Sequence, residues 1–296
     1  MNDAISPAEK AAVLAEALPY IRRFWGKVVV VKYGGNALAG AGDGAGLGDG
    51  LAGFAADIVL MRSVGMRPVV VHGGGPQIGE LMERLGMEPV FRDGLRVTDQ
   101  ATLDVARMVL VGRVNREIVT AINAHGPLAL GLSGEDGQLL MAKQRDPALG
   151  FVGDVTDVNI ELLTGLFEQE LIPVIATIGV DAGGQAYNVN ADSAAAAVAQ
   201  ALQAEKLVFL TDIEGIRGDV DDPASRISTL TPAEAEQLIE DGVVGDGMIP
   251  KVRSCVEAVQ AGVGVAHILD GRVARALLLE IFTAEGIGTM VTEEPA

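Results

Sequence analysis

Short apolar runs alternate along this chain with stretches of helical periodicity, and this alternation restricts the fold more than any other feature of the sequence. Residues 28–32 and 68–72 are apolar runs that end in one polar residue, which is typical of strands buried on both faces of a sheet. Residues 53–64, between them, are expected to form a helix. Parallel strands need a crossover connection, which is usually a helix. The alternation therefore predicts an α/β fold with a mostly parallel central sheet and helices on both faces.

The same patterns predict the remaining elements. Further strands are expected at residues 128–132, 139–142, 150–157, 171–179, 207–211, 266–269 and 288–291. The strands at residues 139–142 and 150–157 are expected to form a hairpin. Further helices are expected at residues 76–85, 101–123, 192–203, 251–261 and 274–282, and after the capping sequence Thr231-Pro232-Ala233-Glu234. Ligands of such sheets bind beyond the carboxyl ends of the strands, so site residues are expected there. The glycine-rich residues 40–50 predict a flexible surface insertion.

The composition excludes several classes of function. The 296 residues carry a formal net charge of −18 at pH 7, whereas general nucleic-acid binding depends on clustered cations. Nucleotide binding is not excluded, because it needs only a few well-placed donors. No apolar stretch approaches the length of a membrane span and no signal peptide is recognised, so no membrane partner is expected. Cys255 is the single cysteine, which excludes an intrachain disulfide and favours a reducing compartment; we expect a cytoplasmic protein.

Residues 6–25 predict an N-terminal helix. Ser6 is a suitable N-cap and Glu9 completes a capping box, while Pro19 is expected to kink the helix. Apolar side chains share one helical face: Leu14, Leu18, Ile21 and Trp25. Two interpretations remain open, since this face would pack on its own subunit or reach a partner subunit.

The first candidate site follows the strand expected at residues 28–32. Lys32 stands at its end, and Gly34 and Gly35 come soon after it. Glycines allow the backbone to turn its N–H groups toward an anion, and the lysine adds a mobile positive charge. A phosphate would suit this arrangement, but a tight turn with a surface lysine has the same sequence, so both interpretations remain open.

The second candidate site follows the strand expected at residues 68–72. His72 precedes three glycines, at residues 73–75, and Pro76 suits the first turn of the next helix. A helix N-terminus attracts negative charge through its free N–H groups and its dipole. His72 has no second histidine or cysteine nearby for a metal site, so a satisfied structural histidine is the main alternative to a functional one.

Four further residues complete the set of candidates. Arg96 lies between apolar neighbours ahead of a helix cap, where it would contact a carboxylate bidentately or pair with an acidic helix. Asn188 and Asp192 lead into an alanine-rich helix, where they would cap the helix, hold a polar ligand or orient a lysine. Lys251 begins a helix, and the helix dipole disfavours a cation there unless an anion offsets it.

Two lysines, two glycine turns and an aspartate together predict a phosphoryl-transfer site. Such chemistry depends mostly on positioning and on neutralising charge. The glycine-rich residues 40–50 are not followed by Gly-Lys-Ser/Thr, so they form no Walker loop. No Cys–His pair or Gly-x-Ser-x-Gly sequence competes as a nucleophile, and no His and Cys cluster suggests a metal.

Five motifs occur in order: Lys-Tyr-Gly-Gly-Asn (32–36), His-Gly-Gly-Gly-Pro (72–76), Gly-Leu-Arg-Val-Thr-Asp (94–99), Asn-Val-Asn-Ala-Asp (188–192) and Gly-Met-Ile-Pro-Lys-Val (247–252). This combination resembles the amino acid kinase superfamily and, within it, the acetylglutamate kinase family. The resemblance spans about residues 6–291 and implies a three-layer αβα sandwich. It implies a lobe for N-acetyl-L-glutamate at residues 27–180 and a lobe for ATP at residues 181–296. The implied products are N-acetyl-L-glutamyl 5-phosphate and ADP, in the second step of arginine biosynthesis.

The resemblance also implies a role for each matching residue. Lys32 and Lys251 would stabilise the transferring phosphoryl group, and Asp192 would orient both lysines. N-acetyl-L-glutamate would bind at Gly74, Gly75, Arg96 and Asn188, with the guanidinium on its α-carboxylate. The phosphates and the rest of the nucleotide would bind at Gly34, Gly35, Thr211, Asp212, Gly215 and Gly247. Mg²⁺ would be held mainly through the ATP phosphates, so no protein ligand to a metal is expected.

Residues 1–26 are similar to the N-terminal helix of the arginine-inhibited members, in which kinked helices link three dimers into a hexamer. The positions that match the inhibitory arginine pocket are Lys206, His267 and Glu280. We therefore expect arginine inhibition and a hexamer built as a trimer of dimers. Regulation by a nitrogen-signalling PII protein, known for some members, is left open.

Two other functions are weighed against this one. A different carboxylate or carbamate kinase of the same superfamily would share the fold and most motifs. A non-catalytic arginine-sensing protein would also share the fold, but Lys32, Asp192 and Lys251 are all present, which speaks against lost catalysis. Residues 40–50 look like an insertion relative to the family, and the connection at residues 143–150 looks shorter than in many members.

Overall fold

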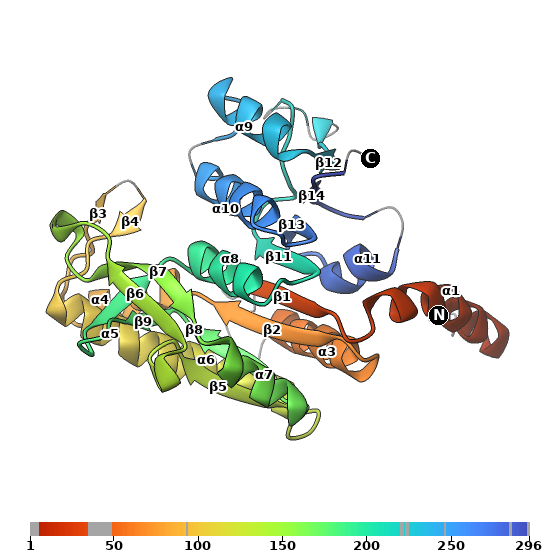
Figure 1. The fold of residues 1–296 in the computed structure, drawn as a ribbon, viewed down its shortest axis with the longest axis horizontal. Helices are drawn as coiled ribbons and strands as arrows, with labels where there is room; N and C mark the ends of the chain where they lie inside the picture. Colours follow the sequence, from red (N-terminus) through yellow and green to blue (C-terminus); the bar gives the residue numbers. More distant parts are fainter. Residues whose placement is uncertain are drawn as a thin grey trace.

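The computed structural model describes residues 6–34, 49–92, 94–219, 222, 225–245, 247–283 and 286–294. These residues form an eight-stranded sheet in the order β12-β14-β13-β11-β1-β2-β8-β5 (Figure 1). In that order the strands are Thr229–Leu230, Thr289–Val291, Val265–Asp270, Lys206–Thr211, Val28–Tyr33, Arg67–His72, Ile172–Ala176 and Ala129–Ser133. β13 and β14 pair antiparallel, and the other neighbouring strands pair parallel. The predicted mostly parallel sheet is confirmed.

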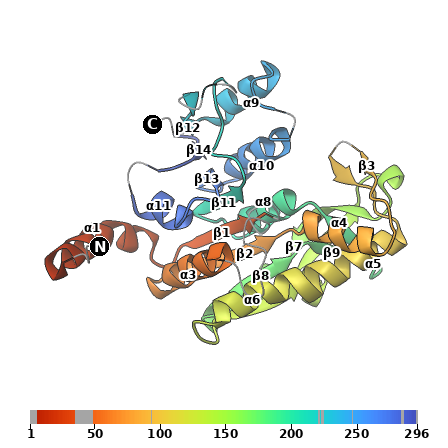
Figure 2. The same ribbon diagram turned by 180° about the vertical axis from the view of Figure 1, so that it is seen from behind.

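Helices cover both faces of this sheet and bury two apolar clusters (Figures 1 and 2). One face carries α3 (Asp49–Ser63), α4 (Gly75–Arg84), α6 (Asn115–Asn123) and α11 (Ala276–Phe282). The other carries α7 (Ile160–Glu168), α8 (Ala191–Ala201), α9 (Pro232–Glu240) and α10 (Ile249–Gln260). Successive side chains of a strand point to opposite faces, so Val29 and Val31 enter the first cluster and Val30 the second. The three-layer αβα sandwich is confirmed.

The carboxyl ends of three neighbouring strands meet at the centre of the sheet. In β1, Tyr33 lies opposite His72 of β2 and opposite Leu210 of β11. The glycine turns that follow β1 and β2 therefore begin side by side, at the edge where parallel sheets bind their ligands.

Four short strands close into a small barrel beside this sheet: β6 (Leu140–Gln144), β7 (Val152–Val158), β9 (Ile178–Val180) and β10 (Ala186–Val189). β6 and β7 form the predicted hairpin. The single strand predicted at residues 171–179 is wrong, because β8 ends at Ala176 and β9 belongs to the barrel. A continuous apolar run does not reveal that its two halves enter different sheets. The sequence also does not predict β10, which lies beyond the expected lobe boundary at residue 180 and pairs with strands before it.

The long helix predicted at residues 101–123 contains one π-helical turn. α5 (Gln100–Val109) continues into Leu110–Val114, and α6 follows directly. Periodicity predicts the helix but not this local widening. The hairpin of β3 (Phe91–Arg92) and β4 (Leu95–Arg96) before it is too short to be predicted. A 3₁₀ turn at Asp136–Gln138 lies between β5 and β6, and another at Pro147–Leu149 lies between β6 and β7.

The N-terminal helix α1 (Pro7–Phe24) has the predicted capping box, with Ser6 and Glu9 each donating a backbone N–H to the other's side chain. It runs through Pro19 and extends away from the body of the molecule (Figures 1 and 2). Its C-terminal Phe24 is buried, but the predicted apolar face stays open, with Leu14 70% and Leu18 52% exposed. The structure therefore does not pack this face on its own subunit.

Part of the glycine-rich stretch can be placed. Residues 40–48 lie outside the described residues, and residues 49 and 50 begin α3. Within the described ranges, no helix combines the length and the apolar character that crossing a bilayer requires.

Asn123, the last residue of α6, closes the turn into β5. Its Oδ1 accepts from the N–H groups of Leu128 and Ala129, and its Nδ2 donates to the Ala129 carbonyl. We expect Asn123→Ala to lower the free energy of unfolding by about 1 kcal/mol, because these backbone groups lose their partners. Urea denaturation followed by circular dichroism measures the change, and an unaltered free energy would contradict this role.

Candidate active site

Asp192 lies between the two predicted lysines. Its Oδ1 is 2.8 Å from Lys32 Nζ, and its Oδ2 is 2.8 Å from Lys251 Nζ. The contact with Lys251 is a hydrogen bond, whereas the contact with Lys32 is an ion pair without hydrogen-bond alignment. The three side chains come from the end of β1 and the first turns of α8 and α10. The structure thus joins residues that are far apart in the sequence, as predicted.

The lysines determine the charge of Asp192. Burial by itself would raise the pKa of the Asp192 carboxyl, but the ammonium groups of Lys32 and Lys251 outweigh burial and hold that pKa below its ordinary value. The carboxylate therefore stays ionised at neutral pH. One anion between two cations leaves the group with one excess positive charge.

A cavity of about 260 Å³ opens beside these three residues. Its lining also includes all four residues predicted to bind the acid substrate: Gly74, Gly75, Arg96 and Asn188. The expectation that these residues come together is confirmed, while their individual roles remain predictions.

Arg96 and Asn188 are held in this lining by neighbouring polar groups. Arg96 donates to the Gly75 carbonyl at 3.0 Å, and its guanidinium lies 4.8 Å from the centroid of the Phe91 ring. Partial burial lowers the pKa of Arg96, but a guanidinium remains charged in proteins. Asn188 Nδ2 donates to Thr98 Oγ1 at 3.2 Å, and Thr98 Oγ1 donates to the Arg96 carbonyl at 2.8 Å. A positioned guanidinium and amide suit a ligand that carries a carboxylate.

The glycines of the two turns leave space for their neighbours. A Cβ at Gly74 would come within 2.7 Å of Leu110 Cδ2, whereas one at Gly75 would meet no atom within 4 Å. A Cβ at Gly34 would lie 3.1 Å from Lys32 Nζ, so glycine there leaves room for the ammonium group. Gly35 lies outside the described residues.

His72 is fully buried and has a partner at each ring nitrogen. Nδ1 lies 3.0 Å from the Gly73 carbonyl oxygen, and Nε2 lies 3.0 Å from Asn115 Nδ2. Burial lowers the pKa of His72 to about 4, so the ring is neutral at physiological pH. The structure favours the interpretation of His72 as a satisfied internal histidine rather than one that touches a ligand.

A second cavity, of about 620 Å³, is lined by the residues after β11 and those before α10. Asp212, Gly215 and Gly247, all predicted to bind the nucleotide, line it. Its apolar lining residues are Ile213, Ile216, Val243, Val244 and Met248. Thr211 does not line this cavity; it is buried at the end of β11 and its Oγ1 donates to Asp212 at 3.1 Å. Apolar walls beside polar groups are typical of small-ligand sites.

Gly215 has a positive φ of 130°, and a Cβ there would lie 2.6 Å from Thr289 Oγ1. Glycine is therefore required at this point in the wall of the second cavity.

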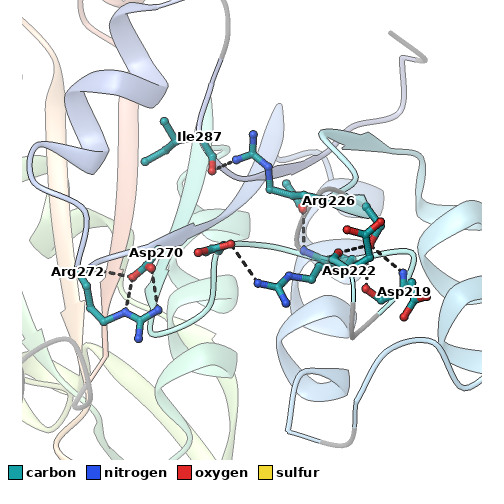
Figure 3. A network of polar contacts seen from close by, with 11 residues as sticks. Asp219, Asp222, Arg226, Asp270, Arg272 and Ile287 are labelled. Atoms are coloured by element: carbon teal, nitrogen blue, oxygen red, sulfur yellow. Dashed lines mark hydrogen bonds and ion pairs between the residues drawn. The ribbon is translucent and has the colours of Figure 1, made fainter.

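Lys251 lines both cavities, so the first cavity meets the second at its ammonium group. Arg272, two residues past the end of β13, also lines the second cavity, and Asp270 holds its guanidinium with both carboxylate oxygens at 2.8 Å (Figure 3). In the same view Arg226 donates to the Ile287 carbonyl. The sequence analysis does not single out Arg272, although a cation just past a central strand is the signal that would have found it.

Leu110, which lines the first cavity from the π-helical turn, is also missed, because it stands in no recognisable pattern. Thr98 lies in the motif at residues 94–99 but is not singled out, although its Oγ1 accepts from Asn188 and so supports the lining. Within the described parts of the chain, no group of three His, Cys, Asp or Glu side chains is placed to hold a metal ion.

Lys206, His267 and Glu280, the positions matched to an arginine pocket, also come together. Lys206 Nζ lies 2.9 Å from His267 Nε2, and His267 Nδ1 lies 2.8 Å from Glu280 Oε1. Burial lowers the pKa of Lys206 to about 8 and lowers that of His267. Burial would raise the pKa of Glu280, but the contacts with His267 and Lys206 lower it to about 2. Lys206 Nζ is 5.3 Å from the centroid of the Phe24 ring, so this cluster touches the end of α1.

Comparisons with known proteins agree with the fold and with the kinase class. The sequence profile described as "Amino acid kinase family" matches residues 27–270. "Acetylglutamate kinase" from Symbiobacterium thermophilum is 55% identical over 96% of this chain and 98% of that protein, and the one from Acidothermus cellulolyticus is 52% identical over 98% and 99%. N-acetylglutamate synthase from Neisseria gonorrhoeae, solved with coenzyme A and N-acetyl-glutamate, has a TM-score of 0.83 at 31% identity over 97% of this chain. This chain spans 64% of the synthase's length.

The fold, the paired lysines and the two cavities thus define a phosphoryl-transfer protein without a Walker loop. This chain belongs to the amino acid kinase family, and within it to the acetylglutamate kinases.

Removing the Asp192 charge tests the electrostatics of the lysine pair. We expect Asp192→Asn to lower the free energy of unfolding by about 3 kcal/mol at pH 7, because two lysines are left without their anion. The pKa of Asp192 is depressed, so its stabilisation is present above the unfolded-state value near 3.8 and is lost as pH falls through the folded value below that. Denaturation at a series of pH values measures the difference in unfolding free energy between the variant and the wild type. This difference should be constant above pH ~5 and become smaller only in acid. A difference that vanishes at neutral pH would contradict this account.

Proposed function

We propose that this chain transfers the γ-phosphoryl group of ATP to the side-chain carboxylate of N-acetyl-L-glutamate, giving N-acetyl-L-glutamyl 5-phosphate and ADP. The observation that carries the proposal is the meeting of the two cavities at Lys251. The first cavity offers a guanidinium, an amide and a glycine turn to a small acid, and the second offers apolar walls and cations to a nucleotide. Relatives named acetylglutamate kinase at 55% and 52% identity support the same reaction.

The reaction needs neutralised charge rather than a general base. A side-chain carboxylate has a pKa of about 4.3, so the nucleophile is already ionised at neutral pH. One of its oxygens attacks the γ-phosphorus, and the bond from this phosphorus to the β–γ bridging oxygen breaks, leaving its electron pair on ADP. The main obstacle is repulsion between two anions. Lys32 and Lys251, both held by Asp192, would reduce this repulsion at the transferring group.

Mg²⁺ would enter this site with ATP. A magnesium ion commonly keeps several waters and binds through substrate phosphates plus one or two carboxylates. Its chemistry here would be to neutralise phosphate charge.

The acceptor acid decides between this function and its main alternative. Arg96 and Asn188 would suit any small carboxylate, so another carboxylate kinase of the family remains the second candidate. The test is to incubate the protein with Mg-ATP and each candidate acid and to trap the acyl phosphate with hydroxylamine. Hydroxamate with N-acetyl-L-glutamate is the expected result, and hydroxamate with free glutamate or carbamate alone would overturn the proposal.

The same assay tests the lysines. We expect Lys32→Met and Lys251→Met each to lower kcat by about 10²–10³, because each removes charge stabilisation of the transition state. The matched control is Lys27→Met, which removes a lysine 52% exposed and paired with Glu205 outside both cavities. This control should keep the wild-type rate. Near-normal rates in both site variants would refute the assigned roles.

Arginine inhibition and assembly are proposed as further properties of this chain. The Lys206–His267–Glu280 cluster offers a carboxylate to a guanidinium, and the N-acetylglutamate synthase of Neisseria gonorrhoeae has also been solved with L-arginine. The exposed apolar face of α1 supports contact with a partner subunit, in a hexamer built as a trimer of dimers. The lobe division at residue 180, binding of a PII protein and a cytoplasmic location stay predictions.

Glu280 provides the test of arginine inhibition. We expect wild-type activity to fall in millimolar arginine, and Glu280→Gln to raise the half-inhibitory concentration about tenfold or more, because the charge-assisted contact with a guanidinium is lost. The control is Glu161→Gln, which changes an exposed residue of α7 and should leave arginine inhibition unaltered. If millimolar arginine does not lower the activity of the wild type, the proposal of arginine inhibition is wrong, while the kinase proposal is unaffected.

A further inference from the structure

The π-helical turn Leu110–Val114 packs against Gly74 in the glycine turn at residues 73–75. A Cβ at Gly74 would come within 2.7 Å of Leu110 Cδ2 and 3.2 Å of Val114 Cγ2, so this packing already excludes a larger residue. The next residue, Asn115, is fully buried and reaches the side chain that precedes the turn. π-helical turns within α-helices frequently lie at functional sites.

Asn115 determines which nitrogen of His72 carries the proton. Its Nδ2 lies 2.8 Å from the Val174 carbonyl, which can only accept, so the amide donates on this side. The same Nδ2 lies 3.0 Å from His72 Nε2, which must therefore be the acceptor. The amide is held in this orientation by Arg116, which donates to Asn115 Oδ1. The neutral ring consequently carries its proton on Nδ1 and donates it to the Gly73 carbonyl at 3.0 Å.

This donation orients a peptide group at the edge of the first cavity. The Gly73 carbonyl and the Gly74 N–H belong to one planar trans peptide unit, so they point in opposite directions. Because His72 holds the carbonyl, the Gly74 N–H points away from the histidine. The Gly73 N–H is occupied by the Tyr33 carbonyl at 3.3 Å. Gly73 and Gly74 both line the cavity assigned to the acid.

We propose that Asn115 and His72 are positioning residues, which hold the Gly73–Gly74 peptide so that its N–H faces the carboxylic acid substrate. The proposal rests on the proposed function, because it takes N-acetyl-L-glutamate as the ligand of this cavity. Neither side chain lines the cavity, so both act through the backbone. Because this N–H donor is already fixed before the acid binds, binding does not require a further loss of conformational entropy to order it.

Two substitutions of His72 separate the donor from the bulk of the ring. In His72→Asn the side-chain amide nitrogen stands close to the place of Nδ1 and can still donate to the Gly73 carbonyl. In His72→Leu no donor is left. We expect His72→Leu to raise the Kd for N-acetyl-L-glutamate, titrated calorimetrically without nucleotide, about tenfold, and His72→Asn to stay within about threefold of wild type. The KM for ATP should be unchanged in both, because the second cavity is not touched.

Asn115→Asp tests the tautomer. A carboxylate facing Nε2 favours the proton there, so the neutral ring no longer donates to Gly73. When the ring is protonated on both nitrogens, Nδ1 again donates to the Gly73 carbonyl. The new carboxylate favours this imidazolium form because it raises the pKa of His72. Among the described residues, Arg116 is the charged neighbour of the ring and opposes its protonation, and Tyr33, opposite His72 in the adjacent strand, has a pKa that burial raises to about 12. Affinity for the acid should therefore rise about threefold or more from pH 8 to pH 6 in this variant, relative to the wild type over the same range.

The matched control is Asn123→Ala, at the other end of the same helix, which should lower stability without changing the Kd. Equal Kd values for His72→Leu and wild type, or equal losses in His72→Leu and His72→Asn, would overturn the positioning role. Should Asn115→Asp fail to fold in a thermal melt, the two His72 variants still decide the question. Wild-type protein that does not bind the acid at all would contradict the proposed function itself, and the positioning role with it.

Discussion

The buried contact between one carboxylate and two ammonium groups is the constraint on which the rest of the site depends. Two like charges a few ångströms apart repel each other by several kcal/mol at the effective dielectric of a protein. Asp192 offsets this repulsion for Lys32 and Lys251 and still leaves one excess positive charge for a ligand. The same contact ties β1 to α8 and α10, so the central sheet and the helices above it share one electrostatic centre.

The groups predicted to act in catalysis and those predicted to bind the acid come from different parts of the fold. The lysines and the aspartate stand on the central sheet and on helices packed against it, whereas Arg96 comes from the small β3–β4 hairpin and Asn188 from the barrel. The barrel and the hairpin lie outside the eight-stranded sheet, but buried barrel residues such as Leu140 and Tyr187 pack in the same apolar cluster as Val30 of the sheet.

The Lys206–His267–Glu280 cluster occupies the other end of the same strands. Lys206 is the first residue of β11, and Thr211, its last residue, precedes Asp212, which lines the second cavity. None of the three cluster residues lines either cavity. An effect of a ligand bound there would therefore have to pass through the packed strands, through α11 or through the contact with α1.

The sequence by itself determined the αβα class, most strands and helices, and the residues that meet at the site. Apolar runs, caps and glycine turns act locally, and parallel strands necessarily bring their carboxyl ends to one edge of the sheet. Only the tertiary structure decided that the apolar run at residues 171–179 divides between two sheets, that a π-helical turn follows α5, and that Arg272 lines the second cavity. It likewise decided that Asn115, spaced with Ile118 and Ile122 on one buried face, holds His72. Such contacts depend on how the side chains of distant elements pack, which the pattern of polar and apolar residues within one segment does not specify.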